Sequence, residues 1–190
     1  KKRFGIGKER KTEIKAFDTI NATKVIIANR KLYVDYEEGF IGYGLKKNDP
    51  VSDCSEIDDI ICFFASGKMM VSKVSDKKFV GKDILHVGVW KKEDERTIYN
   101  LIYSDVKSNK NFVKRFNVTA ITRDKEYEVA KGDNCKVLYL TVNPNGEAET
   151  VTVKLTSSSK ARIKIFDFDF SSVIVKGRSS LGNTLSTYPI

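Results

Sequence analysis

Histidine, tryptophan, cysteine and proline are scarce in this chain of 190 residues, which contains one, one, three and three of them. A single histidine and the separated Cys54, Cys62 and Cys135 provide no metal-ligand spacing, so we interpret the cysteines as buried free thiols of a reducing cytoplasm. The few prolines and the absence of a long Gly/Ser tract indicate no interdomain linker. A chain of this length can form one domain with a substantial core.

Long apolar runs and catalytic motifs are missing as well. No stretch approaches the roughly 18 apolar residues that span a bilayer, and no signal-peptide pattern opens the chain. The sequence has no phosphate-binding loop, dinucleotide fingerprint, zinc motif or nucleophile elbow. His86 lies in an apolar run without a Ser or Cys at motif spacing, and the carboxylates of residues 49–59 match no calcium loop. We therefore predict no catalytic residue, metal site, cofactor or membrane contact for this chain.

A β-hairpin pattern organises what is present. In its clearest copy, residues 96–121, apolar runs of residues 97–103 and 112–121 flank a polar turn. β-Branched and aromatic runs separated by Asp, Lys, Ser and Asn are typical of paired strands with a longer loop. Weaker copies are predicted at residues 24–36 (with a turn at Asn29 and Arg30), 59–74, 137–155 and 163–176.

The copies recur at intervals of 28 to 39 residues. Hairpins at such intervals are typical of propellers and solenoids, in which each unit needs neighbours to bury its faces. Two copies also share a Phe-x-Gly-x-x-aliphatic exit, at residues 40–45 and 79–84. We therefore predict an all-β, propeller-like array over residues 23–190, preceded by a basic connector over residues 1–22. Helix is expected only in the first 20 residues or in a short turn.

The formal net charge of +9 favours an anionic partner if the charge is segregated on one surface. Residues 1–15 hold seven basic and two acidic side chains. Within the repeats, basic residues recur near turns and on return strands, whereas carboxylates collect in the connections. In a radial array this would form a basic stripe along an outer edge, as a row of phosphates requires. The candidate DNA-binding residues are Lys73, Lys77, Lys78, Lys82, Lys107, Lys110, Lys114, Arg115, Lys176 and Arg178.

Simpler interpretations of two features stay open. The lysines can serve solubility alone on exposed strand faces and edges. Phe166, Phe168 and Phe170 alternate with Asp167 and Asp169, so the three rings share one face of a strand. We interpret these rings as core between units, with Phe166 and Phe168 largely buried, rather than as a base-stacking platform.

Short motifs in a fixed order resemble a known family. Phe112-Val-Lys-Arg-Phe116 resembles a repeat strand in the C-terminal domain of DNA gyrase A subunits, and Val175-Lys-Gly-Arg-Ser-Ser-Leu-Gly-Asn183 resembles the passage that follows it. Residues 8–14, leading into Phe17-Asp-Thr-Ile20 and Ala22-Thr-Lys-Val25, are similar to the connector before the first repeat in topoisomerase IV A subunits, especially those of Bacteroidetes-type bacteria. The resemblance covers essentially the whole chain.

This resemblance implies a β-pinwheel, a disc of four-stranded blades in which neighbouring units exchange strands. The chain would hold a partial disc of about four to five repeats, truncated at both ends relative to the full-length protein. Residues 177–182 match the Gln-Arg-Arg-Gly-Gly-x-Gly box of gyrase only in part. The lack of a full box favours a topoisomerase IV-like enzyme over a gyrase.

The resemblance also implies a function and partners. The domain would belong to a cytoplasmic, nucleoid-associated type IIA topoisomerase and would bind and bend duplex DNA for the catalytic core. Its partners would be the N-terminal core of the same polypeptide and the separate ATPase chain of the enzyme, the B subunit, and these would hold Mg²⁺ and ATP. The cleaving tyrosine, its partner arginine and the metal-binding carboxylates of such enzymes have no counterparts in this sequence.

Two functional hypotheses from different classes result. The first is a non-catalytic domain that binds duplex DNA without sequence preference, since no base-reading helix is evident. The alternative is a protein-interaction propeller whose lysines serve only solubility. The salt dependence of DNA binding distinguishes the two hypotheses, because phosphate contacts make the affinity for DNA fall steeply as ionic strength rises. A hydrolase propeller with a central metal site is disfavoured by the scattered carboxylates and the lone His86.

Overall fold

The computed structural model describes residues 29–46 and 48–190, and the predicted connector over residues 1–22 lies outside them. The regular structure of the described residues is β, apart from one turn of 3-10 helix at Phe170–Ser172. None of their helical structure is long and apolar enough to cross a membrane. The all-β prediction is therefore confirmed.

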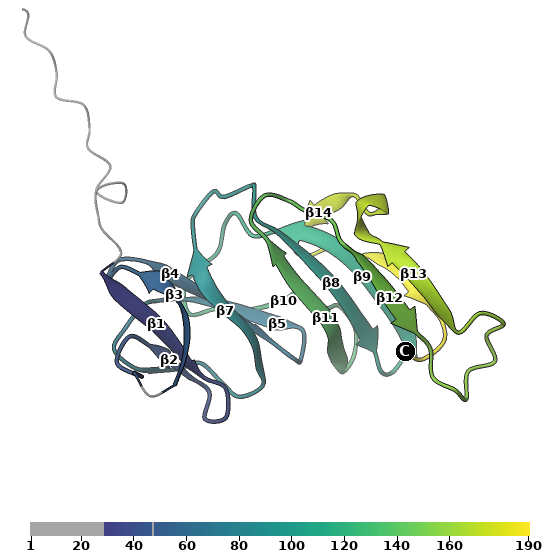
Figure 1. Cartoon of the computed structure of the whole chain (residues 1–190), viewed down its shortest axis with the longest axis horizontal. Coiled ribbons are helices and arrows are strands. Elements are labelled where there is room, and N and C mark those ends of the chain that lie inside the picture. Colours follow the sequence, from purple (N-terminus) through teal and green to yellow (C-terminus); the bar gives the residue numbers. More distant parts are fainter. Residues whose placement is uncertain (1–28, 47) are drawn as a thin grey trace, which may run out of the picture.

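Within the described residues the strands form four sheets, which follow one another in chain order along the long axis of the molecule (Figure 1). The first sheet has the strand order β3-β1-β2-β6, with bounds Asp49–Cys54, Arg30–Asp35, Phe40–Gly42 and Lys78–Phe79. The second has the order β10-β5-β4-β7, with bounds Glu126–Glu128, Lys68–Lys73, Asp59–Phe64 and Ile84–Trp90. The third has the order β11-β8-β9-β14, with bounds Cys135–Asn143, Ile98–Asp105, Lys110–Asn117 and Val175–Gly177. The strand β15 (Asn183–Ser186) also pairs with β9, and the fourth sheet consists of β12 (Thr150–Lys154) and β13 (Ile165–Asp169).

Neighbouring units exchange strands, as in a β-pinwheel. After the pair β4–β5, the chain returns to the first sheet, where β6 pairs with β2. After β8–β9 it returns to the second sheet, where β10 pairs with β5, and after β12–β13 it returns to the third, where β14 pairs with β9. The outermost strand of each of the first three sheets therefore comes from the following unit. We call the edges formed by β6, β10 and β14 the rim.

The two Phe-x-Gly exits of the sequence meet at the first of these exchanges. Phe40 of β2 pairs with Phe79 of β6, and their ring centroids lie 5.4 Å apart in an edge-to-face arrangement. Gly39 has a φ of 77°, and a Cβ there would lie 2.3 Å from the carbonyl oxygen of Gly81. Glycine is required at this position because the two backbones approach so closely.

Several predicted hairpins differ from the observed pairing. The copies at residues 59–74 and 96–121 are confirmed as β4–β5 and β8–β9. The predicted turn at Asn29 and Arg30 is wrong, since Arg30 begins β1, which pairs with β2 and β3; the arm before it lies outside the described residues. The predicted pairings within residues 137–155 and 163–176 are also wrong, because β11 pairs with β8, β12 with β13, and β14 runs parallel to β9.

The core lies between successive sheets. Phe63 of the second sheet packs against Tyr99 and Phe116 of the third, with ring centroids 4.8 and 6.3 Å away. Strands β4 and β8 are buried over most of their length because both of their faces are covered. Strand β13 alternates instead, since only one face of the two-stranded fourth sheet is covered.

Phe166 and Phe168 are partly buried, and Phe168 packs against the core around Phe170. Phe170 itself is fully buried beside Tyr139. The reason is that Phe170 follows β13 in the 3-10 turn and enters the core of the third sheet, where Ile102 and Val113 surround it.

Candidate nucleic-acid interface

Six of the ten predicted DNA-binding residues are exposed lysines, and five of these six have no ion-pair partner among the described residues. Two of these five flank the rim strand β6 and one lies in β14, whereas the other two lie at the end of β5 and at the start of β9. The ammonium group of one of them, Lys77, lies 4.2 Å from the centroid of the Phe40 ring, which leaves it open to solvent on the other side. The five are Lys73, Lys77, Lys82, Lys110 and Lys176.

Two further predicted residues form exposed ion pairs with acidic side chains that follow the hairpin of the third sheet. Lys78 of β6 pairs with Asp124, and Lys107 pairs with Asp133. Exposed pairs of this kind contribute only about 0–1 kcal/mol. A phosphate could therefore replace the carboxylate at little cost.

Arg178, beside the rim strand β14, is half-buried and already engaged. Its guanidinium carbon lies 4.3 Å from the centroid of the Tyr127 ring, and its Nη1 donates to the carbonyl oxygen of Ala120 at 2.6 Å. Since Tyr127 belongs to β10, Arg178 joins the rim of the third sheet to that of the second.

Lys114 does not lie on the surface, which corrects its predicted position. Its side chain is 1% exposed, and Nζ donates to the carbonyl oxygens of Arg178 at 2.7 Å and Ser180 at 3.0 Å. Burial and the nearby positive charge of Lys131 lower the pKa of Lys114 to about 8. The position of Lys114 in the middle of a strand with both faces covered explains this burial, and its role is to fix the segment that follows β14.

Arg115, also predicted on the basic edge, is 8% exposed and is likewise internal. Its Nε donates to Asn100 Oδ1 at 3.0 Å, and Nη2 donates to the carbonyl oxygens of Gly146 at 2.7 Å and Glu147 at 3.1 Å. Asn100 in turn donates to Glu149 Oε2 at 2.7 Å. The guanidinium group therefore fixes the connection between β11 and β12 and is not available to a phosphate.

Glu149 completes the hydrogen-bond network of Arg115 and Asn100. It accepts hydrogen bonds from the hydroxyl groups of Tyr139 and Thr141. Burial raises the pKa of Glu149, but the hydrogen bonds from Thr141, its own backbone, Asn100 and Tyr139 together outweigh it, so that the pKa is lowered overall. The carboxylate is therefore held in its charged form, as a satisfied buried network requires.

Sequence reasoning missed Lys125, an exposed residue immediately before rim strand β10. Its Nζ lies 5.5 Å from the centroid of the Tyr127 ring. Residues 122–134 carry no hairpin pattern, and only the strand exchange brings them to the rim. No local pattern in the sequence therefore pointed to Lys125.

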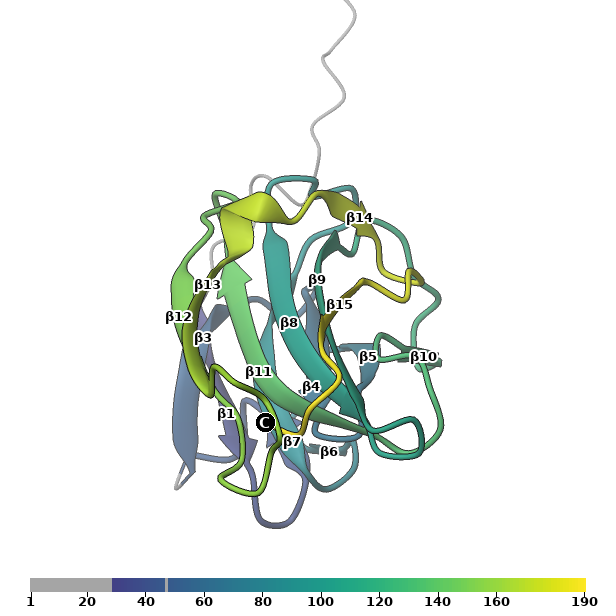
Figure 2. The same cartoon turned by 90° about the vertical axis from the view of Figure 1, so that its right-hand side faces the viewer.

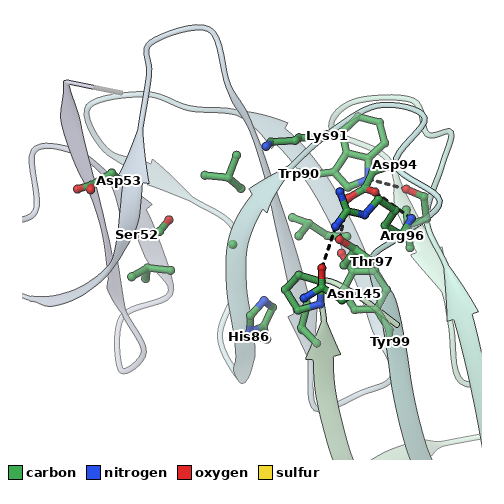
Figure 3. A pocket seen from close by; sticks show the side chains of 17 residues that line it. Ser52, Asp53, His86, Trp90, Lys91, Asp94, Arg96, Thr97, Tyr99 and Asn145 are labelled. Atoms are coloured by element: carbon green, nitrogen blue, oxygen red, sulfur yellow. Dashed lines mark hydrogen bonds between the residues drawn. The ribbon is translucent and has the colours of Figure 1, made fainter. Parts of the chain in front are cut away.

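A cavity of about 550 Å³ lies on the opposite side of the second sheet from its rim, where β3, β7 and the end of β11 meet (Figure 3). Asp53, His86, Trp90 and Arg96 are among its lining residues. Burial lowers the pKa of His86, so the imidazole is neutral near pH 7. Arg96 Nη2 donates to Asn145 Oδ1 at 2.8 Å. In the part of the chain that the structure describes, no three His, Cys, Asp or Glu side chains are grouped as metal ligands.

Two comparisons with known proteins agree with this architecture. The chain is 28% identical over 137 residues to the A subunit of DNA topoisomerase 4 from Borreliella burgdorferi, and the match covers 72% of this chain and 22% of that relative. The chain thus corresponds to about a fifth of the length of the relative. The sequence model of the family described as topoisomerase C-terminal domain, Bacteroidota, matches residues 31–190. Because this match spans most of the chain and the sheets exchange strands as the resemblance implied, the chain belongs to the family of Bacteroidota topoisomerase C-terminal domains.

Proposed function

We propose that this domain binds and bends duplex DNA without sequence preference, through basic side chains along the rim. The observation that carries the proposal is the recurrence of exposed lysines beside all three rim strands: Lys77 and Lys82 beside β6, Lys125 beside β10 and Lys176 in β14. A row of positive charges along successive sheet edges matches the repeating charge of a phosphate backbone. Backbone contacts carry no base information, so the binding is independent of sequence.

Bending follows from the arrangement of the rim. The rim strands do not lie on one straight line, since Figure 2 shows β14 at the upper right, β10 at the right and β6 at the bottom of the molecule. A duplex that contacts lysines on successive sheets has to follow this curvature. Bending a short site costs on the order of 1–6 kcal/mol, so contacts on several sheets are needed to offset it.

We place the domain in an ATP-dependent type IIA topoisomerase that resembles topoisomerase IV rather than gyrase. The family match, the topoisomerase 4 relative and the incomplete gyrase box at residues 177–182 support this assignment. The domain itself is non-catalytic and presents DNA in the cytoplasm to the core of its own polypeptide. That core and the ATPase B subunit supply the chemistry, with Mg²⁺ and ATP.

The proposal is tested by the salt dependence of binding to two unrelated duplexes. In a log–log plot, affinity should fall with salt, and Lys82→Ala/Lys176→Ala should reduce the slope by about 0.9 per lysine removed, equally on both duplexes. Lys154→Ala/Lys160→Ala is the matched control, because it removes the same charge from exposed positions of the fourth unit away from the rim. Binding that is absent at low salt or insensitive to salt would favour the protein-interaction alternative.

A further inference from the structure

The most exposed aromatic side chain of the described residues stands on the rim itself. Phe79 of β6 is 57% exposed, although a phenyl ring in water is unfavourable. It is not loosely placed: β6 pairs with β2 through Phe40, and the amide of Val80 donates to the carbonyl oxygen of Gly39 at 2.9 Å. The backbone that carries Phe79 is therefore held on both sides of the ring.

The surroundings of Phe79 leave its ring open. Its one aromatic contact among the described residues is the edge-to-face contact with Phe40, and the face of Phe40 is occupied by Lys77. The equivalent aromatic on the next rim strand, Tyr127 of β10, differs, because Arg178 and Lys125 both stack on it. Phe79 is thus a largely exposed ring whose neighbours in sequence are three lysines, Lys77, Lys78 and Lys82, and two carboxylates, Asp76 and Asp83.

We propose that Phe79 is an apolar wedge that inserts between base pairs of the bound duplex and kinks it at the first sheet. This inference rests on the proposed DNA binding. Lysines on either side of the ring would hold the phosphates of the groove in which it inserts. Side chains such as Phe and Leu between base steps unstack DNA and concentrate the bend, which lets the duplex contact more protein surface. The wedge thereby lowers the free energy needed to bend the duplex along the rim from one sheet to the next.

A matched control exists on another sheet. Ile165 of β13 is 58% exposed, nearly the same as Phe79, but it lies on the fourth sheet, which carries no rim strand among the described residues. In the proposed binding mode the duplex follows the rim and does not reach this side chain. Ile165→Ala therefore reports the general effect of removing an exposed apolar side chain.

The experiment compares wild type, Phe79→Ala and Ile165→Ala on a short duplex that carries a fluorescent dye at each end and 2-aminopurine at its centre. Wild type should bring the ends closer and raise the 2-aminopurine signal, because the base is unstacked. Phe79→Ala should lose both signals and bind about tenfold more weakly, the value of one base–aromatic contact, while its salt slope stays unchanged because no charge is lost. A central mismatch, which is already partly unstacked, should tighten binding by wild type more than by Phe79→Ala.

Each outcome decides a different question. If wild type fails to bind the duplex, both the proposed function and the wedge are ruled out. If Phe79→Ala binds and bends the duplex like wild type, the wedge is ruled out and the proposed DNA binding is kept. Loss of binding to the topoisomerase core without any change on DNA would overturn the wedge in favour of protein docking. Thermal unfolding checks that the variants are folded, and Phe79→Gln replaces Phe79→Ala if the smaller side chain disturbs β6.

Discussion

Lys114 is a basic residue whose role depends on its surroundings rather than on its type. Its ammonium group is buried and donates to two backbone carbonyl groups of residues 178–180. In Lys114→Met the stem remains but both carbonyl groups lose their donor. Since each buried unsatisfied group costs about 1–3 kcal/mol, we expect the free energy of unfolding to drop by roughly 2–4 kcal/mol in a denaturant titration at pH 7.

The effect of Lys114 should also depend on pH. Its pKa is lowered to about 8 in the folded state, against an ordinary value near 10.4 in the unfolded chain. Between these values the unfolded state binds the extra proton, so stability rises with pH by up to about 1.4 kcal/mol per unit. The difference in unfolding free energy between wild type and Lys114→Met should therefore grow from pH 8 to pH 10. The exposed Lys110→Met should show no such trend, and a pH-independent difference for Lys114→Met would contradict the buried charge.

At the scale of elements, the exchange of short strands depends on glycines that permit close backbone approach. A side chain at Gly39 would collide with the carbonyl oxygen of Gly81. Gly39 also has a left-handed backbone conformation, which favours glycine. Gly39→Ala should thus cost about 2–4 kcal/mol of stability, from backbone strain and the displacement of β6. Gly177→Ala in β14 is the matched control, because a Cβ there meets no atom within 4 Å and should change stability by less than about 0.5 kcal/mol. Similar unfolding midpoints for the two variants would show that β6 tolerates displacement.

At the scale of the whole molecule, strand exchange makes each sheet depend on the next. Ion pairs add to this coupling, since Arg123, after the third-sheet hairpin, pairs with Asp59 of the second sheet, and Lys78 pairs with Asp124. We therefore expect the described sheets to unfold together rather than one at a time.

Trp90 provides the probe for this prediction, because it is the single tryptophan of the chain and packs in the core shared by the second and third sheets. Its indole nitrogen donates to the carbonyl oxygen of Val118 at 2.7 Å. Tryptophan fluorescence, which reports this site, and far-ultraviolet circular dichroism, which reports all strands, should show the same denaturant midpoint. Separate midpoints would mean that the units unfold independently.

Local pattern in the sequence determined those features that depend on neighbouring residues. The pairs β4–β5 and β8–β9 were predictable because their strands are adjacent in the chain and largely apolar or β-branched, with a polar turn between them. The all-β class and the presence of exposed basic residues were predictable for the same reason, whereas the interval was not, since β8 and β12 begin 52 residues apart. The resemblance to topoisomerase C-terminal domains added the strand exchange.

Only the tertiary structure decided which partner each strand takes and which lysines reach solvent. Strand β14 pairs with β9 across about 60 residues of intervening chain, which no hairpin rule could indicate. Lys114 and Arg115 differ from Lys110 in exposure although all three lie in β9, because only the end of that strand extends beyond the neighbouring sheets. Periodicity within a strand identifies its two faces, whereas burial of a face depends on what the rest of the chain packs against it.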